Sequence, residues 1–162
     1  MLSRTAENLF WMGRYMERAD ATARLIEMGY RMSMLPGSNE QEEWRSVAAA
    51  SGSAPDIVDA DKLDAATVVQ RLLLDPENLS SIRSCLTAAR ANGRAIRTAL
   101  TQDMWEALND GWRSLGQMDA DTALKNLPCC WSGPRTARRR FVARRRSRCC
   151  GMMATISCAW AV

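Results

Sequence analysis

The side chains best suited to chemistry lie on one face of the N-terminal segment. At about 100° per residue of α-helix, five of them share this face: Arg4, Glu7, Trp11, Arg14 and Arg18. A guanidinium group is a planar fork of donors that binds a carboxylate or a phosphate through two hydrogen bonds. The face therefore predicts ion pairs within the protein or the binding of an anionic partner.

The charges around this face leave three interpretations open. Arg14 and Arg18 carry the same charge one turn apart, which destabilises an isolated helix by about 0.2–0.5 kcal/mol. Glu17 can neutralise Arg14, one turn before it, or Arg24, two turns after it. The face is a solvated surface with internal ion pairs, a polar network buried between two helices, or a site for an anion or ligand.

A second set of arginines follows one side of the segment 82–100, with no acidic residue among them. We call this set the arginine strip; it consists of Arg83, Arg90, Arg94 and Arg97, and Asn92 lies within the same segment. The positive charge of four aligned arginines needs compensation by negative charge. The candidates are the acidic residues 40–43, the charged face of the N-terminal segment, or an external anion. The other interpretation is a charged surface in solvent. No glycine-rich phosphate loop accompanies the strip.

The absence of histidine from the chain removes several kinds of site. Ser-His-Asp and Cys-His catalysis and histidine metal sites are excluded. The adjacent pairs Cys129-Cys130 and Cys149-Cys150 do not have the spacing of zinc ligands. We therefore expect no metal, no cofactor and no enzymatic activity. The alternative is an enzyme component using Glu17 or Glu7 with an arginine anion clamp, although nearby arginines would weaken either carboxylate as a base.

The elements that position these residues are all helical by their apolar spacing. Helices are predicted over 4–33, 40–51, 62–74, 82–100 and 101–118. The first should begin at a Ser3 cap and the second at a Ser38–Gln41 capping box, and Ser80 or Ser81 should cap the fourth. Pro36-Gly37 and Asp75-Pro76 act as breaks. Whether 82–100 and 101–118 form one rod stays open.

Two of these helices carry core stripes at three-and-four spacing. The first stripe is Leu2, Leu9, Met12, Met16, Ala19, Ala23, Ile26 and Tyr30. The second is Ile82, Leu86, Ala89, Gly93, Ile96 and Leu100. Short connections make neighbouring helices antiparallel. The predicted fold class is all-α, an antiparallel bundle of about five helices followed by a mostly irregular tail.

Charge divides the 162 residues into two unlike parts. Residues 1–121 hold all 18 acidic and 13 of the 22 basic residues, a formal charge of −5, while residues 122–162 carry +9 and five of the six cysteines. The chain shows neither a secretory signal nor an apolar run of about 20 residues. We therefore expect a cytoplasmic protein with reduced thiols.

Three motifs carry a family resemblance. The opening run from Met1 to Leu25 with its Glu17-Arg18 pair, the run Ser81–Arg90 with Asn92 and Arg94, and Met104–Asn109 resemble the bacterial alpha-E family over residues 1 to about 126. Ala91 and Gly93 depart from the family pattern, in which an acid and an alanine are usual. Glycine costs about 1 kcal/mol inside a helix unless a neighbouring helix packs closely there.

The resemblance implies an all-helical domain of unknown molecular function. It also implies association with ATP-grasp proteins resembling peptide ligases and with transglutaminase-like peptidases. We accordingly expect a non-catalytic accessory or binding protein that contacts such a partner, with self-association as a further expectation.

Residues 127–162 do not resemble the family, so we expect a non-native, disordered tail. A one-nucleotide frame shift near Asn126 explains its charge and cysteines. The codons of Met152-Met153, read one base earlier, can encode Asp-Asp, as in the family's continuation, and sequencing the gene tests this. The weaker alternative is a basic arm that binds nucleic acid.

Overall fold

The computed structural model describes residues 2–52, 63–119 and 122–123. Within these ranges the chain is helical, with no strand, and the predicted all-α class is confirmed. The α-helices are α1 (Leu2–Ser33), α2 (Glu40–Ser51), α4 (Ala65–Val69), α5 (Ile82–Ala95) and α6 (Gln102–Gly116). The predicted tail at 127–162, with its frame shift, lies outside the described residues.

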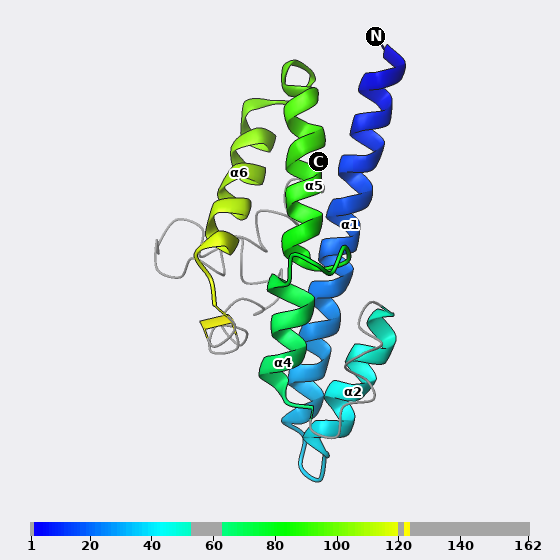
Figure 1. Cartoon of the computed structure of the whole chain (residues 1–162), viewed down its shortest axis with the longest axis vertical. Helices are drawn as coiled ribbons and strands as arrows, with labels where there is room; N and C mark the ends of the chain where they lie inside the picture. Colours follow the sequence, from blue (N-terminus) through cyan, green and yellow to red (C-terminus); the bar gives the residue numbers. More distant parts are fainter. Residues whose placement is uncertain (1, 53–62, 120–121, 124–162) are drawn as a thin grey trace, which may run out of the picture.

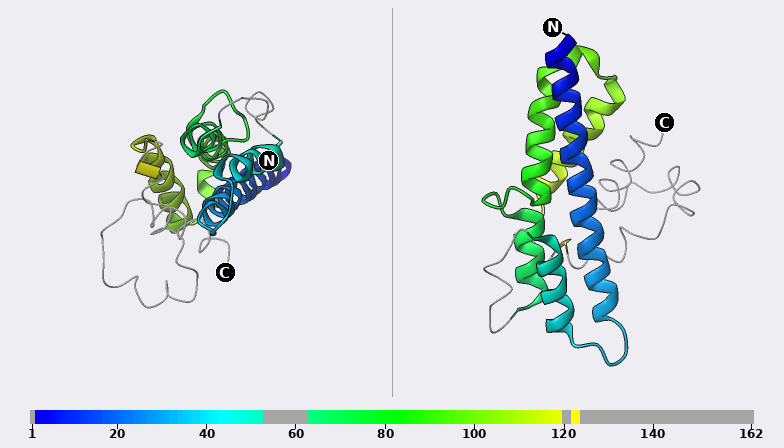
Figure 2. Two further views of the ribbon diagram at one scale, coloured as in Figure 1. Left: turned by 90° about the horizontal axis from the view of Figure 1, so that it is seen from below. Right: turned by 90° about the vertical axis from the view of Figure 1, so that its right-hand side faces the viewer.

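The long helix α1 is the axis against which the other helices pack (Figure 1). Its C-terminal half lies beside α2 and α4, and α5 continues along α1 above α4. Met12 of α1 lies against Gly93 of α5, while Thr22 donates a hydrogen bond of 3.4 Å to the carbonyl of Ser80. These contacts run in opposite chain directions, so α1 and α5 are antiparallel. Figure 2 shows α6 on the far side of α5 from α2.

The predicted core stripe of α1 is correct from Met12 onward and wrong before it. Met12, Met16, Ala19, Ala23 and Ile26 are buried, and the stripe's last member, Tyr30, packs on the core. Leu2, in contrast, is 89% exposed, and Leu9 is also exposed. No described helix covers that side of the first turns of α1. The apolar spacing therefore extends to Leu2, although the residues before Met12 that carry it are not buried. The predicted Ser3 cap is also wrong, because α1 already includes Leu2 and Ser3.

All six predicted core residues of α5 and the turn after it are buried. Of the two predicted candidates, Ser81 and not Ser80 caps α5, accepting a hydrogen bond of 3.1 Å from the amide of Ser84. The α-helix ends at Ala95, and a 3₁₀ turn (Arg97–Ala99) leads to Thr101, which caps α6. The segments 82–100 and 101–118 are therefore two helices and not one rod.

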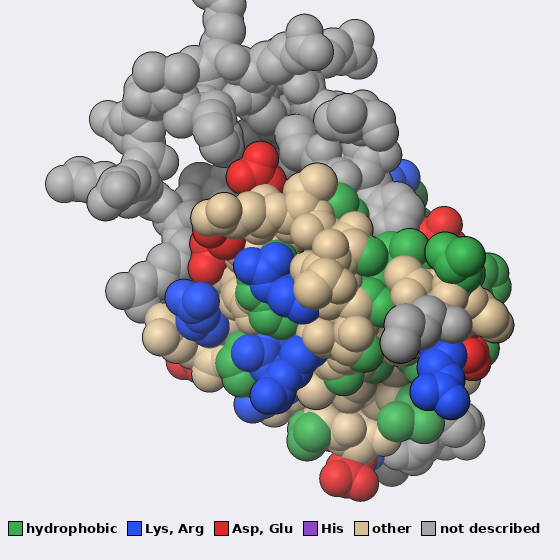
Figure 3. Space-filling view, turned by 90° about the horizontal axis from the view of Figure 1, so that it is seen from above, with side chains coloured by type: hydrophobic (Ala, Val, Ile, Leu, Met, Phe, Trp, Pro, Cys, Tyr) green, Lys and Arg blue, Asp and Glu red, His purple; other side chains and the backbone are tan. Residues whose placement is uncertain are grey.

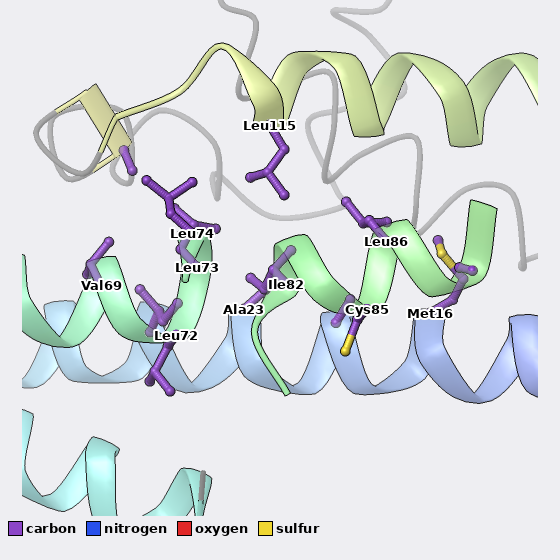
Figure 4. Packing of buried hydrophobic residues seen from close by; sticks show 14 of the residues in the cluster. Met16, Ala23, Val69, Leu72, Leu73, Leu74, Ile82, Cys85, Leu86 and Leu115 are labelled. Atoms are coloured by element: carbon purple, nitrogen blue, oxygen red, sulfur yellow. The ribbon is translucent and has the colours of Figure 1, made fainter. Parts of the chain in front are cut away.

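The core extends along α1 from Met12 to Ile26, and Figure 4 shows part of it. Leu72, Leu73 and Leu74 enter it from a wider π-helical turn (Gln70–Leu74) that continues α4. Ile82, Cys85 and Leu86 enter from α5, and Leu115 reaches the core from α6. Side chains from α4 with its π-helical turn, from α5 and from α6 thus form one continuous apolar core with those of α1. The charged side chains of these helices lie outside this core.

The helix α2 has the predicted bounds but not the predicted cap. Asn39 occupies the N-cap position without a side-chain hydrogen bond, and Ser38 donates instead to the carbonyls of Ser33 and Leu35. The capping box is therefore wrong, since Ser38 belongs to the preceding turn. Gly52 ends α2 with φ of 61°, in the left-handed region that favours glycine.

Candidate functional site

The charged face of α1 is exposed along its predicted length. Arg4, Glu7, Arg14 and Arg18 are all exposed, and Trp11 is 44% exposed. The first interpretation, a solvated face with internal ion pairs, agrees best with this position. A polar network buried between helices is excluded for these side chains.

Glu17 lies at the edge of this face and pairs within its own helix. Its carboxylate accepts a hydrogen bond of 3.3 Å from Arg14, and its side chain is 72% exposed. Arg24 pairs at 2.8 Å with Asp20 and not with Glu17. Arg4 and Arg18 form no ion pair with any carboxylate in the described ranges. The face therefore keeps two cations available to a partner.

Aromatic side chains adjoin these charges. Phe10 and Trp11 meet edge to face with 5.5 Å between ring centroids, and Trp11 lies 6.0 Å from Tyr15. Phe10 is 60% exposed. Exposed large rings beside unpaired arginines are a composition enriched at protein interfaces. We call Arg4, Glu7, Phe10, Trp11, Arg14, Glu17 and Arg18 the α1 face.

The arginine strip lies where α5 meets α6, and α6 completes it. The guanidinium of Arg90 stacks over the ring of Trp112 at 4.4 Å, while its Nε donates a hydrogen bond of 2.7 Å to Asn109. Seven residues further along the chain, in the 3₁₀ turn after α5, Arg97 stacks over Trp105 at 5.1 Å. Sequence reasoning missed both stacks, because they depend on the register between the two helices. The two tryptophans lie seven residues apart in the sequence, which places them on one side of α6.

The other two arginines of the strip are less constrained. Arg83 and Arg94 are exposed and form no ion pair with a carboxylate in the part of the chain that the structure describes. Asn92 uses its amide within α5, donating 2.9 Å to the carbonyl of Ala88. Figure 3 shows the end of the molecule that includes the turn between α5 and α6, where arginine side chains gather beside hydrophobic ones.

The acidic residues proposed to compensate the strip do not reach it. Glu40, Glu42 and Glu43 form the first turn of α2, at the opposite end of the molecule (Figure 1). Neither glutamate of the α1 face forms an ion pair with the strip among the described residues, and Glu17 pairs with Arg14. Aromatic rings and one amide compensate two of the four arginines, and the external anion stays a hypothesis for the other two.

Three ionisable groups outside the α1 face and the arginine strip have shifted pKa values. Burial raises the pKa of Glu27, against the opposing effect of its ion-pair partner Arg31 and of Arg24. Hydrogen bonds from Arg71, then from the amide of Glu77, lower the pKa of Asp75. Burial raises the pKa of the Cys85 thiol, while Arg18 opposes it. These shifts have structural causes in packing, ion pairing and hydrogen bonding.

The described residues contain no group of three metal-ligating side chains that could hold an ion. None of the described helices is long and apolar enough to cross a membrane.

Comparison with known proteins identifies one family. The family model named Alpha-E, a predicted alpha-helical domain with a conserved ER motif, matches residues 1–156. No curated protein and no solved structure matches significantly. The matched range includes most of the segment for which a frame shift is expected, and that expectation stays a prediction.

Proposed function

Since the chain belongs to the Alpha-E family, we propose that it is a non-catalytic, cytoplasmic helical protein that binds a protein partner through the α1 face. The observation that carries the proposal is the position of the Glu17-Arg18 pair. Glu17 is 72% exposed and Arg18 forms no ion pair within the described residues. A pair that joined two helices would be buried between them, whereas this pair can meet a second protein.

The composition of the α1 face supports a protein partner. Phe10 and Trp11 supply apolar area, while Arg4 and Arg18 supply donors that a carboxylate can occupy. The family resemblance of the three motifs suggests which proteins to test, namely an ATP-grasp protein resembling peptide ligases or a transglutaminase-like peptidase. No cofactor is part of this proposal.

The test is reconstitution of the pair. The chain would be co-expressed with the ATP-grasp protein of the same genome, and separately with the transglutaminase-like peptidase, and complexes would be separated by gel filtration. We expect Phe10→Ala combined with Arg18→Gln to abolish co-elution. Arg113→Gln removes an exposed arginine on α6 and is the matched control. Absence of any complex with either protein would overturn the proposal.

The alternative of an enzyme component is less supported by the geometry. A catalytic carboxylate needs a site that excludes water and raises its proton affinity. Glu17 instead lies on the surface, paired with Arg14. The weaker alternative, nucleic-acid binding through the basic tail, concerns residues outside the described part of the chain.

A further inference from the structure

We propose that the arginine strip and the two tryptophans of α6 form a second binding surface, whose occupant is an acidic segment of a protein. This inference goes beyond the proposed function, because it uses a different face and specifies the chemistry of its ligand. The surface consists of Arg83, Arg90, Arg94, Arg97, Trp105 and Trp112.

The first argument is the balance of charge on the strip. The sequence of α5 contains no carboxylate. On α6, the nearest helix, Asp110 pairs with Arg113 and Glu106 accepts a hydrogen bond from Gln102. Arg83 and Arg94 therefore have no ion-pair partner among the residues described, and their charge attracts an external anion.

The second argument is that two of the arginines are already positioned. Arg90 is held by a ring at 4.4 Å and by Asn109 at 2.7 Å, and Trp112 is itself held because its Nε1 donates 3.2 Å to Thr87. Stacking occupies the flat face of a guanidinium, whereas its in-plane donors are the groups that bind a carboxylate. A side chain fixed before binding loses less conformational entropy when the ligand arrives.

The third argument distinguishes an acidic peptide from nucleic acid. The strip from Arg83 to Arg97 is about 21 Å long at 1.5 Å per residue. Beyond its edge, the outer side of α6 carries the exposed acids Asp103, Glu106 and Asp110. A long polyanion that extended past the strip would meet these carboxylates within about a Debye length. A short acidic segment fits within the strip and avoids them.

The strip and the α1 face lie on different sides of α5. Arg18 of the α1 face is close enough to Cys85 to affect its pKa. Cys85 and Arg90 are about 140° apart around the helix, at roughly 100° per residue. Variants of the two faces can therefore be tested separately, and failure at one leaves the other in place.

The experiment measures fluorescence anisotropy of a short labelled peptide, in which glutamate alternates with alanine, against the full chain at low ionic strength. The variant Arg83→Gln/Arg94→Gln removes two exposed cations that form no ion pair among the described residues, so the fold should persist. We expect its affinity to fall about five- to thirtyfold. The matched control, Arg24→Gln/Arg113→Gln, removes the same charge elsewhere and should change affinity less than about twofold.

A second variant tests positioning without a change in charge. Arg90→Lys keeps the cation but loses the planar fork that both stacks on Trp112 and reaches Asn109. We expect affinity to fall about threefold or more, while Arg24→Lys, which keeps a cation beside Asp20 outside both faces, leaves it unchanged. Far-UV circular dichroism verifies that each variant is folded.

Three outcomes would overturn the proposal. No binding of the peptide by the unmodified chain would do so, as would equal losses in the two double variants, which would attribute binding to net charge. The third is a single-stranded oligothymidylate that binds as tightly as the peptide and is weakened by the same substitutions. That result would assign the strip to phosphate recognition instead.

Discussion

Gly29 is a position where the structure predicts whether a substitution raises or lowers the free energy of unfolding. It lies in α1 against α2, and a Cβ added there would be 2.6 Å from Cγ2 of Val47. The same Cβ would lie 3.1 and 3.2 Å from two ring atoms of Trp44. Both neighbours are buried, and valine is branched at Cβ and therefore stiff. The interface must shift if Gly29 is replaced by alanine.

The magnitude follows from two opposing effects. Alanine is more favourable than glycine inside a helix by about 0.8–1.0 kcal/mol. Overpacking a filled interface costs about 1–3 kcal/mol. We therefore expect Gly29→Ala to lower the free energy of unfolding by about 1 kcal/mol, against the direction that helix propensity alone would give.

Two other helical glycines are matched controls. At Gly93 an added Cβ meets Cδ2 of Leu108 at 3.1 Å and Sδ of Met12 at 3.3 Å, the ends of flexible side chains. Gly93→Ala should therefore be nearly neutral. At Gly116 nothing lies within 4 Å of the added atom among the described residues, and alanine should stabilise by up to about 1 kcal/mol.

The assay is urea unfolding followed by far-UV circular dichroism, with the slope of each transition compared. Val47→Ala in the Gly29→Ala background removes the clashing methyl group and should recover about 1 kcal/mol relative to additivity. If all three glycine-to-alanine variants shifted stability in the same direction, available space would not be the deciding factor. That result would refute the close packing of α1 on α2 at Gly29.

Four further substitutions address two serine hydroxyls and two carboxylates with shifted pKa values. Ser81→Ala removes the α5 cap and a buried hydrogen bond of 2.6 Å to the Asp75 carbonyl, and should cost about 1–2 kcal/mol in urea unfolding. Ser38→Ala should cost less, since Ser38 caps no helix N-terminus and its hydroxyl donates only to carbonyls at and after the end of α1; equal costs would contradict this. The pKa of Glu27 is raised above 4.5, so its stabilising effect is lost as pH rises through the folded pKa, and Glu27→Gln should flatten that part of the pH–stability curve. The pKa of Asp75 is lowered below 3.8, so its contribution is lost as pH falls through the folded pKa, and Asp75→Asn should flatten the acid limb. Unchanged curves for either variant would refute the assigned environment.

Local signals in the sequence predicted most of the helices. The stripe of α5 was found in full, because three-and-four spacing is a property of the helix itself and the helix is covered along that side. Ser81 was found because a hydroxyl before an apolar run needs only the next three residues to act as a cap. The condition under which glycine is tolerated at position 93 is met, since Met12 and Leu108 lie against it.

The errors arose where the outcome depended on a distant segment. Leu2 and Leu9 continue the spacing of Met12 and Met16, but spacing does not show whether another helix covers them. Ser38 has the sequence context of a capping box, yet the turn after α1 takes its hydroxyl to Ser33 and Leu35. Local patterns predict which groups are able to interact, whereas the tertiary arrangement selects the partner.

The same distinction explains what the sequence showed of the arginine strip. Four arginines on one side of a helix were evident, and the need for compensation followed from their charge alone. The compensation itself required α6 to lie antiparallel to α5, in the register that places Arg90 on Trp112 and Arg97 on Trp105. Rings attract cations without neutralising them, so this solution positions the strip and leaves its charge in place. A carboxylate in the place of either ring would neutralise the arginine beside it and leave less charge for a ligand. Tryptophan at these two positions therefore favours a binding surface over a purely structural one.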